Sequence, residues 1–168
     1  MKNMSTMSHS MTEPKEIMIM MIIMFFAGLL SSMNIWVDKI SDVKFHLNDV
    51  YMSLLMCGWS LLFMGIYYTN ISLFLIGIIM TSIIIYCIRN QIFIDEEQYI
   101  KGMIPHHSMA VLMSKQLLKK TDNDNNNDND NKNDIYISNP IKKLANHIIN
   151  SQEHEIKLMK KIKNSIYI

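Results

Sequence analysis

The residues best suited to chemistry are crowded into one short stretch, residues 98–113, which reads QYIKGMIPHHSMAVLM. On a helix, side chains three and four positions apart share a face, so Met103 would meet both His106 and His107. Imidazole and thioether together form a soft ligand set that suits Cu(I). The alternative is a methionine-filled helix core with two half-exposed histidines. The candidate metal ligands are His106, His107, Met103, Met109 and Met113.

Pro105 lies inside this helical pattern, directly before the two histidines. Proline has no N–H to donate to the carbonyl of Lys101, and its ring clashes there, so the pattern predicts a kink. Such a kink can aim two neighbouring imidazoles toward one space.

The helix that carries these residues is expected to begin at Asp95, with Gln98 completing a capping box, and to end near Lys120. Apolar residues follow it in two adjacent rows, and both histidines are therefore expected on a wide core-facing surface. The first row, interpreted as a bundle seam, is Tyr99, Met103, His106, Ala110, Met113 and Leu117. The second row is Ile100, Ile104, His107, Val111 and Leu118.

A second helix is expected from Asn139-Pro140 to about Lys163, because Pro is favoured at the first helical position. Gln152 and Glu155 are polar positions on its apolar stripe, and burying them requires partners. A facing histidine would supply one, with Gln152 and Glu155 orienting the imidazole and Met159 lining the site. His147 and His154 lie off this stripe and are expected to face water. The predicted stripe is Ile141, Ala145, Ile148, Gln152, Glu155, Met159 and Ile162.

The segment between these helices, residues 121–134, consists almost entirely of Asn and Asp. It cannot bury apolar surface and is expected to be a disordered loop. Its alternating Asp residues imitate part of a calcium loop. However, Asn127 replaces the turn glycine and Asn133 replaces the bidentate glutamate, which argues against a calcium site.

The first half of the chain predicts a membrane domain over residues 17–89. Three apolar runs, each long enough to span a bilayer, occupy residues 17–37, 50–68 and 71–88. The preceding residues 1–16 form a polar tail that contains Met and His and is expected to be disordered.

Three spans would place the first loop and the C-terminal domain, residues 95–168, on the same side of the membrane. That side carries more Lys and Arg than the other, which favours a cytosolic C-terminal domain. His46 and Asp49, where the second span begins, share this side and are possible accessory ligands. Met52 and Met56 form a weaker methionine pair within the span.

Composition excludes several classes of function. A net charge of +1 over 168 residues gives no basic surface for nucleic acid. The 2 Cys residues lie in apolar runs, so no disulfide framework or zinc motif is indicated. No catalytic triad, phosphate loop or dinucleotide motif is present, so we expect neither an enzyme nor an organic cofactor.

Two motifs carry a family resemblance. The first is MIPHHS at residues 103–108 followed by Ala110, and the second comprises Leu144-Ala145, Ile148-Ile149, Gln152, Glu155-Ile156 and Met159. In both motifs the chain resembles the domain-of-unknown-function family 305. The resemblance covers residues 97–162, and the stretch from His46 to Met52 resembles the membrane-anchored branch of that family. It implies a ferritin-like helical bundle and copper or silver binding through Met and His.

The chain has one copy of the helix pair, half of a four-helix bundle. A single hairpin exposes too much apolar surface to be stable alone, so we expect a homodimer or higher homo-oligomer in contact with membrane lipid. The expected fold is therefore all-α, with three transmembrane helices followed by a two-helix antiparallel hairpin.

The sequence is also compatible with two alternatives to a copper-binding module. The three spans, the Met/His tail and the Met52–Met56 pair resemble copper transporters, although the third span lacks their Gly-x-x-x-Gly motif. A structural or assembly protein is the other alternative. In that case His106 and His107 would only form a polar network that fixes helix register.

Overall fold

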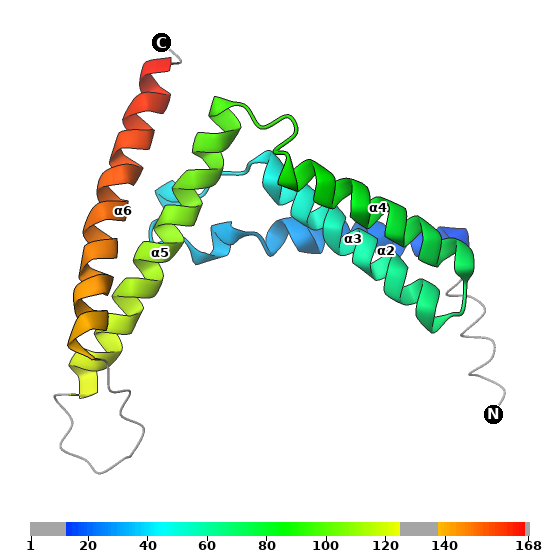
Figure 1. Cartoon of the computed structure of the whole chain (residues 1–168), viewed down its shortest axis with the longest axis horizontal. Helices are drawn as coiled ribbons and strands as arrows, with labels where there is room; N and C mark the ends of the chain where they lie inside the picture. The colour runs from blue at the N-terminus through cyan, green and yellow to red at the C-terminus, as the bar shows by residue number, and fades with distance from the viewer. Residues whose placement is uncertain (1–12, 125–137, 167–168) are drawn as a thin grey trace. The chain divides into compact units, whose positions relative to one another are not determined.

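The computed structural model describes residues 13–124 and 138–166, and all regular elements within these ranges are helical, as predicted (Figure 1). Three helices long and apolar enough to cross a membrane are followed by two more. The elements are α2 (Pro14–Leu30), the short 3-10 helices η1 (Met33–Trp36) and η2 (Ile40–Asp42), α3 (Leu47–Tyr67), α4 (Ile71–Arg89), α5 (Glu96–Asp124) and α6 (Asn139–Ile166).

The chain divides into two compact units. The first contains α2, α3 and α4, and its three apolar helical segments are Pro14–Trp36, Leu47–Tyr67 and Ile71–Arg89. These segments match the three predicted spans to within three residues at each end. The match is close because length and hydropathy are local properties of the sequence.

Helices α3 and α4 form a tight antiparallel hairpin in this first unit. Its turn is closed by Asn70, whose Oδ1 accepts the backbone N–H groups of Ser72 and Leu73 at 3.0 and 3.2 Å. The two backbones approach closely at glycines. A Cβ atom on Gly65 would lie 2.4 Å from a backbone atom of α4, and one on Gly77 would lie 2.5 Å from the backbone N of Leu62. Only glycine permits this separation.

The second unit contains α5 and α6 together with residues Met33–Phe45. Asp95 caps α5 as predicted, accepting the backbone N–H of Gln98 at 2.8 Å. The helix continues through Pro105, whose ring is buried. It also extends through Asp124, beyond the predicted end; residues 125–137 of the Asn/Asp segment and residues 1–12 of the tail lie outside the described residues.

The core between α5 and α6 differs from the predicted seam. Ile104, Val111 and Ile156 are buried, with Ile100 and Met159 packed against them. The second apolar row of α5 therefore faces α6. The prediction that the first row forms the seam is wrong: its exposed members include Tyr99 at 57%, His106 and Met113 at 56%.

The stripe on α6 is shifted in the same way. Ala145 and Ile156 are buried, whereas Ile141 and Ile162 are 44% and 40% exposed. The physical reason lies in the segment 33–45, which was expected to be partly membrane span and partly loop. It packs on α5 and buries Ser108, so the side of α5 that carries Ser108 is occupied by this segment, and the adjacent row of Ile104 faces α6.

Candidate functional site

The two adjacent histidines of α5 occupy different environments. Their ring centroids are 6.0 Å apart, with an angle of 61° between the ring planes. His106 is exposed, whereas the side chain of His107 is only 12% exposed. Successive side chains on a helix point about 100° apart, so only one imidazole turns toward α6. The prediction that both histidines face the core is wrong for His106.

His107 meets the polar partner expected for it on α6. Its Nδ1 lies 3.0 Å from Oε2 of Glu155, a contact that becomes an ion pair only when the ring is protonated. The angle does not meet hydrogen-bond geometry, however, and Nδ1 is buried without a hydrogen bond. Ser151 donates a hydrogen bond of 3.0 Å to the other carboxylate oxygen, Oε1. Gln152 is half-buried, and among the described residues no hydrogen bond joins it to either histidine.

Burial lowers the pKa of His107 below its usual value of 6.5, because desolvation disfavours the charged ring. The carboxylate of Glu155 opposes this effect, and the neighbouring His106 adds to it. The lowered pKa favours the neutral ring, the form in which imidazole binds a metal.

The lowered pKa predicts a specific dependence of stability on pH. Because the unfolded chain binds a proton at His107 more readily, stability is fully present above pH 6.5 and falls as pH drops from 6.5 toward the lowered folded-state pKa. Replacing His107 with Gln should reduce the slope with which the thermal midpoint of the full chain changes between pH 7.5 and 5. The exposed His154, changed to Gln, should leave the slope unchanged. An unaltered slope in His107→Gln would contradict the assignment.

The candidate methionines differ in how accessible they are. Met103 and Met109 are half-buried, Met113 is 56% exposed, and Met159 packs against the core. Within residues 13–124 and 138–166, no three His, Cys, Asp or Glu side chains gather as a metal site. At this site one copy of the chain thus offers the two imidazoles of His106 and His107, with nearby thioethers as further soft donors.

The possible accessory residues at the start of α3 have a structural role. His46 is buried, and its Nδ1 accepts the backbone N–H of Asp49 at 3.1 Å. The Asp49 carboxylate accepts the backbone N–H of His46 at 3.2 Å, which completes a capping box. Met52 and Met56 are 54% and 39% exposed on the outer surface of α3.

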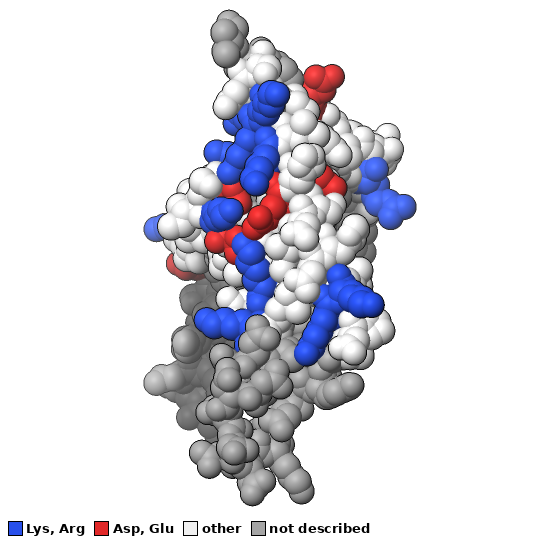
Figure 2. All heavy atoms as spheres, turned by 90° about the vertical axis from the view of Figure 1, so that its left-hand side faces the viewer, with Lys and Arg blue, Asp and Glu red and all other residues white. Residues whose placement is uncertain are grey.

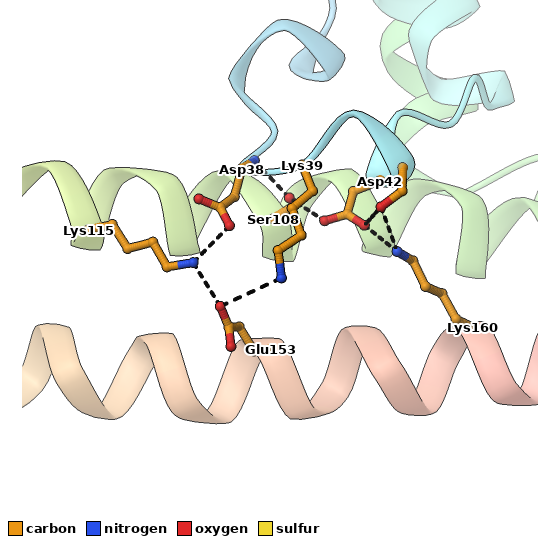
Figure 3. A network of polar contacts seen from close by, with 8 residues as sticks. Asp38, Lys39, Asp42, Ser108, Lys115, Glu153 and Lys160 are labelled. Carbon is orange, nitrogen blue, oxygen red and sulfur yellow. Dashed lines mark hydrogen bonds and ion pairs between the residues drawn. The ribbon is translucent and has the colours of Figure 1, made fainter.

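Sequence reasoning missed a polar network that fastens the segment 33–45 to the helical hairpin (Figure 3). Its centre is Asp42, which is 2% exposed. The Asp42 carboxylate accepts a 2.7 Å hydrogen bond from Ser108 Oγ and pairs with the ammonium of Lys160. Burial alone would raise the pKa of Asp42, but the hydrogen bonds from Lys160 and Ser108 outweigh it, so the pKa lies below its usual 3.8.

A second group of charges extends this network along α5. Lys115 Nζ lies 2.8 Å from Oδ2 of Asp38 and 2.8 Å from Oε1 of Glu153 on α6. The hydrogen bonds to Asp38 and Glu153 raise the pKa of Lys115, and the one from Lys115 lowers that of Glu153. Ser108 also accepts the backbone N–H of Asp38 at 2.9 Å, so its hydroxyl joins both groups.

A cleft of about 230 Å³ lies within this network. Figure 2 shows lysine side chains surrounding a group of acidic side chains on this face of the molecule. The walls of the cleft are formed by Asp38, Lys39, Asp42, Ser108, Val111, Glu153, Ile156, Lys157 and Lys160. Each acidic residue of the cleft forms an ion pair with a lysine. These ion pairs hold the segment 33–45, α5 and α6 together.

This network could not be predicted from the sequence. Ser108 belongs to the MIPHHS motif, but Asp42 and Lys160 are 118 positions apart. Helical and strand periodicities relate only neighbouring positions, so they cannot pair residues at that separation.

Comparison with known proteins gives two matches. The family described as "Domain of unknown function (DUF305)" matches residues 94–163, which cover α5 and most of α6. The chain is also 43% identical over 154 residues to "Uncharacterized protein L153" of Acanthamoeba polyphaga mimivirus, covering 87% of this chain and 90% of that protein. No solved structure matches the chain.

Proposed function

Since this chain belongs to the DUF305 family, we propose that it is an integral membrane protein whose C-terminal helical hairpin binds Cu(I) through His106 and His107. The observation that carries the proposal is the largely buried His107, whose ring lies beside that of His106 and whose Nδ1 lacks a hydrogen bond. The proposed activity is binding rather than catalysis.

The donors of α5 fit a soft monovalent metal. Imidazole nitrogen binds a metal at roughly 2 Å, so two rings on one ion have centroids roughly 5 to 6 Å apart, which is compatible with the observed 6.0 Å. Met103 lies one helical turn before both histidines, and Met109 follows one turn after His106. Cu(I) and Ag(I) both favour such nitrogen and thioether donors.

Glu155 is the residue that would orient His107. A ligating histidine usually donates its second ring N–H to a carboxylate, which fixes the tautomer and the direction of the ring. A small rotation of the Glu155 carboxylate, now 3.0 Å from Nδ1, would complete that hydrogen bond and leave Nε2 for the metal.

The polar network supports the proposed three-span topology. Asp42 follows the first apolar helix and Lys160 lies on α6, so their ion pair requires both segments to be on the same side of a membrane. Two further crossings by α3 and α4 return the chain to that side. The excess of Lys and Arg there favours the cytosol.

Copper binding should depend on the two α5 histidines together. We expect the full chain in detergent to compete for Cu(I) with a chromophoric chelator. The double variant His106→Ala/His107→Ala should bind more than roughly 100-fold more weakly, because loss of even an outer partner costs about 10- to 100-fold.

The matched control is His147→Ala/His154→Ala, which removes the two exposed histidines of α6 and should leave affinity unchanged. Equal binding by both double variants would place copper elsewhere. Absence of binding by the parent chain would favour the structural alternative, in which the histidines only organise the helix pair.

A further inference from the structure

One face of the α5–α6 hairpin is open and apolar. On α5 the open row follows alternating steps of four and three residues, and on α6 a second stripe does the same. The contact between His107 and Glu155 joins the two stripes. The exposed residues of this open face are Tyr99, His106 and Met113 on α5 and Leu144, Leu158 and Ile162 on α6.

The opposite side of α5 already has its partner. There the segment 33–45 covers Ser108, which is fully buried and bonded to Asp42. On the open face, by contrast, Tyr99 and Met113 are more than half exposed, as is Leu144 at 53%. The hairpin's buried hydrophobic cluster comprises Ile104, Val111 and Ile156, too little for a helix pair to be stable without further cover.

The candidate metal site is also incomplete within the described part of one chain. No third His, Cys, Asp or Glu joins His106 and His107 there as a ligand group. His106 is exposed at the middle of the open row, seven residues from Tyr99 and seven from Met113.

We infer that a second copy of this chain packs on the open face and that the two copies share one Cu(I) site at their symmetry axis. The inference rests on the proposed function and adds the partner that completes the site. In a two-fold interface, a residue near the axis meets its own counterpart. With the axis beside His106 and the two α5 helices antiparallel, the imidazoles of both copies converge on one ion.

The same axis accounts for the residues on either side of His106. Tyr99 of one copy then lies opposite Met113 of the other, because both are seven residues from the axis. A thioether against an aromatic ring is a favourable contact. The two hairpins together form a four-helix bundle that buries the stripes of both α6 helices.

The test compares the mass and the copper stoichiometry of the full chain in detergent, at several ratios of protein to detergent. We expect a dimer by light scattering and one Cu(I) per two chains by chelator competition. Leu144→Glu should reduce the dimer and weaken Cu(I) binding at least 10-fold at low protein concentration. Leu144 lies eleven residues from Glu155, about 16 Å along the helix, so the substitution does not touch the ligands.

Asn150→Glu, which adds the same charge at an exposed position of α6, should change neither measurement. A monomer that binds one Cu(I) per chain would refute the shared site and leave the proposed function standing. A dimer that binds no Cu(I) would refute both. Equal effects of Leu144→Glu and Asn150→Glu would also overturn the inference, since the open face would then be irrelevant to assembly.

Discussion

Replacing Gly77 with Leu is expected to break the packing of α3 on α4. Even the first added carbon would lie 2.5 Å from the backbone N of Leu62, and backbone cannot move aside as a flexible side chain can. The helices must separate along their length, which also loses the close approach at Gly65. We expect the free energy of unfolding to fall by about 3 kcal/mol or more, the upper part of the range for overpacking. Thermal unfolding of the purified chain in detergent would measure it.

The control for this substitution lies on the same helix. Ser82 is exposed on α4, so Ser82→Leu adds a large apolar side chain without meeting α3. Its free energy of unfolding should lie within about 0.5 kcal/mol of the parent's, as is usual for surface substitutions. If Gly77→Leu unfolded at the same temperature as Ser82→Leu, the close contact of the two helices would be refuted.

Replacing Lys160 with Met is expected to be more damaging than removing its partner Asp42. The lysine is 35% exposed and can reach water when left alone, whereas the Asp42 carboxylate is 3% exposed and cannot. Stranding a buried charge costs about 3–5 kcal/mol. We expect about 3 kcal/mol, because Ser108 and Ser41 still donate hydrogen bonds to Asp42.

The pH dependence separates this explanation from a simple loss of packing. In the parent chain the pKa of Asp42 lies below 3.8, so its stabilisation is present above that pH and is lost as pH falls through the lowered pKa. Without Lys160, burial is opposed only by the hydrogen bonds from Ser108 and Ser41, so the pKa of Asp42 is higher in the variant than in the parent. The stability that Lys160→Met loses relative to the parent should therefore become smaller as pH falls from 7 toward 4.

Two further variants complete this test. Lys161→Met, at the exposed neighbouring position, should be nearly neutral. Asp42→Ala/Lys160→Met should recover part of the lost stability, since no buried charge remains unpaired. A double variant as unstable as the sum of the two single variants would show that the pair is not coupled.

The parts of the fold that sequence could predict are those set by neighbouring residues. The apolar runs predicted the three helices that are long and apolar enough to cross a membrane, and Asp95 marked the start of α5. The orientation of α5 could not be predicted in the same way, because Tyr99 and Ile104 belong to two equally apolar rows. The row of Ile104 faces α6 in a structure where Ser108 meets Asp42, a contact between residues 66 positions apart that no local pattern reveals.

The candidate site was predictable to a similar degree. The crowding of His106 and His107 with methionines, and the polar Glu155 on the facing helix, were visible in the sequence, and the structure does bring Glu155 to His107. The sequence could not show that His106 points away from α6. Nor could it show that His46 caps α3, because a capping histidine has no distinguishing spacing.

The ion pair between Asp42 and Lys160 also sets the order in which the protein can be completed on the ribosome. Asp42 is synthesised 118 residues before Lys160, an interval of roughly 6 to 24 s at ~5–20 residues per second. The apolar helices α3 and α4 are made within that interval, and so is Ser108. Attachment of the segment 33–45 through this ion pair therefore comes late in the folding of the single chain, and a chain terminated before α6 would never reach it.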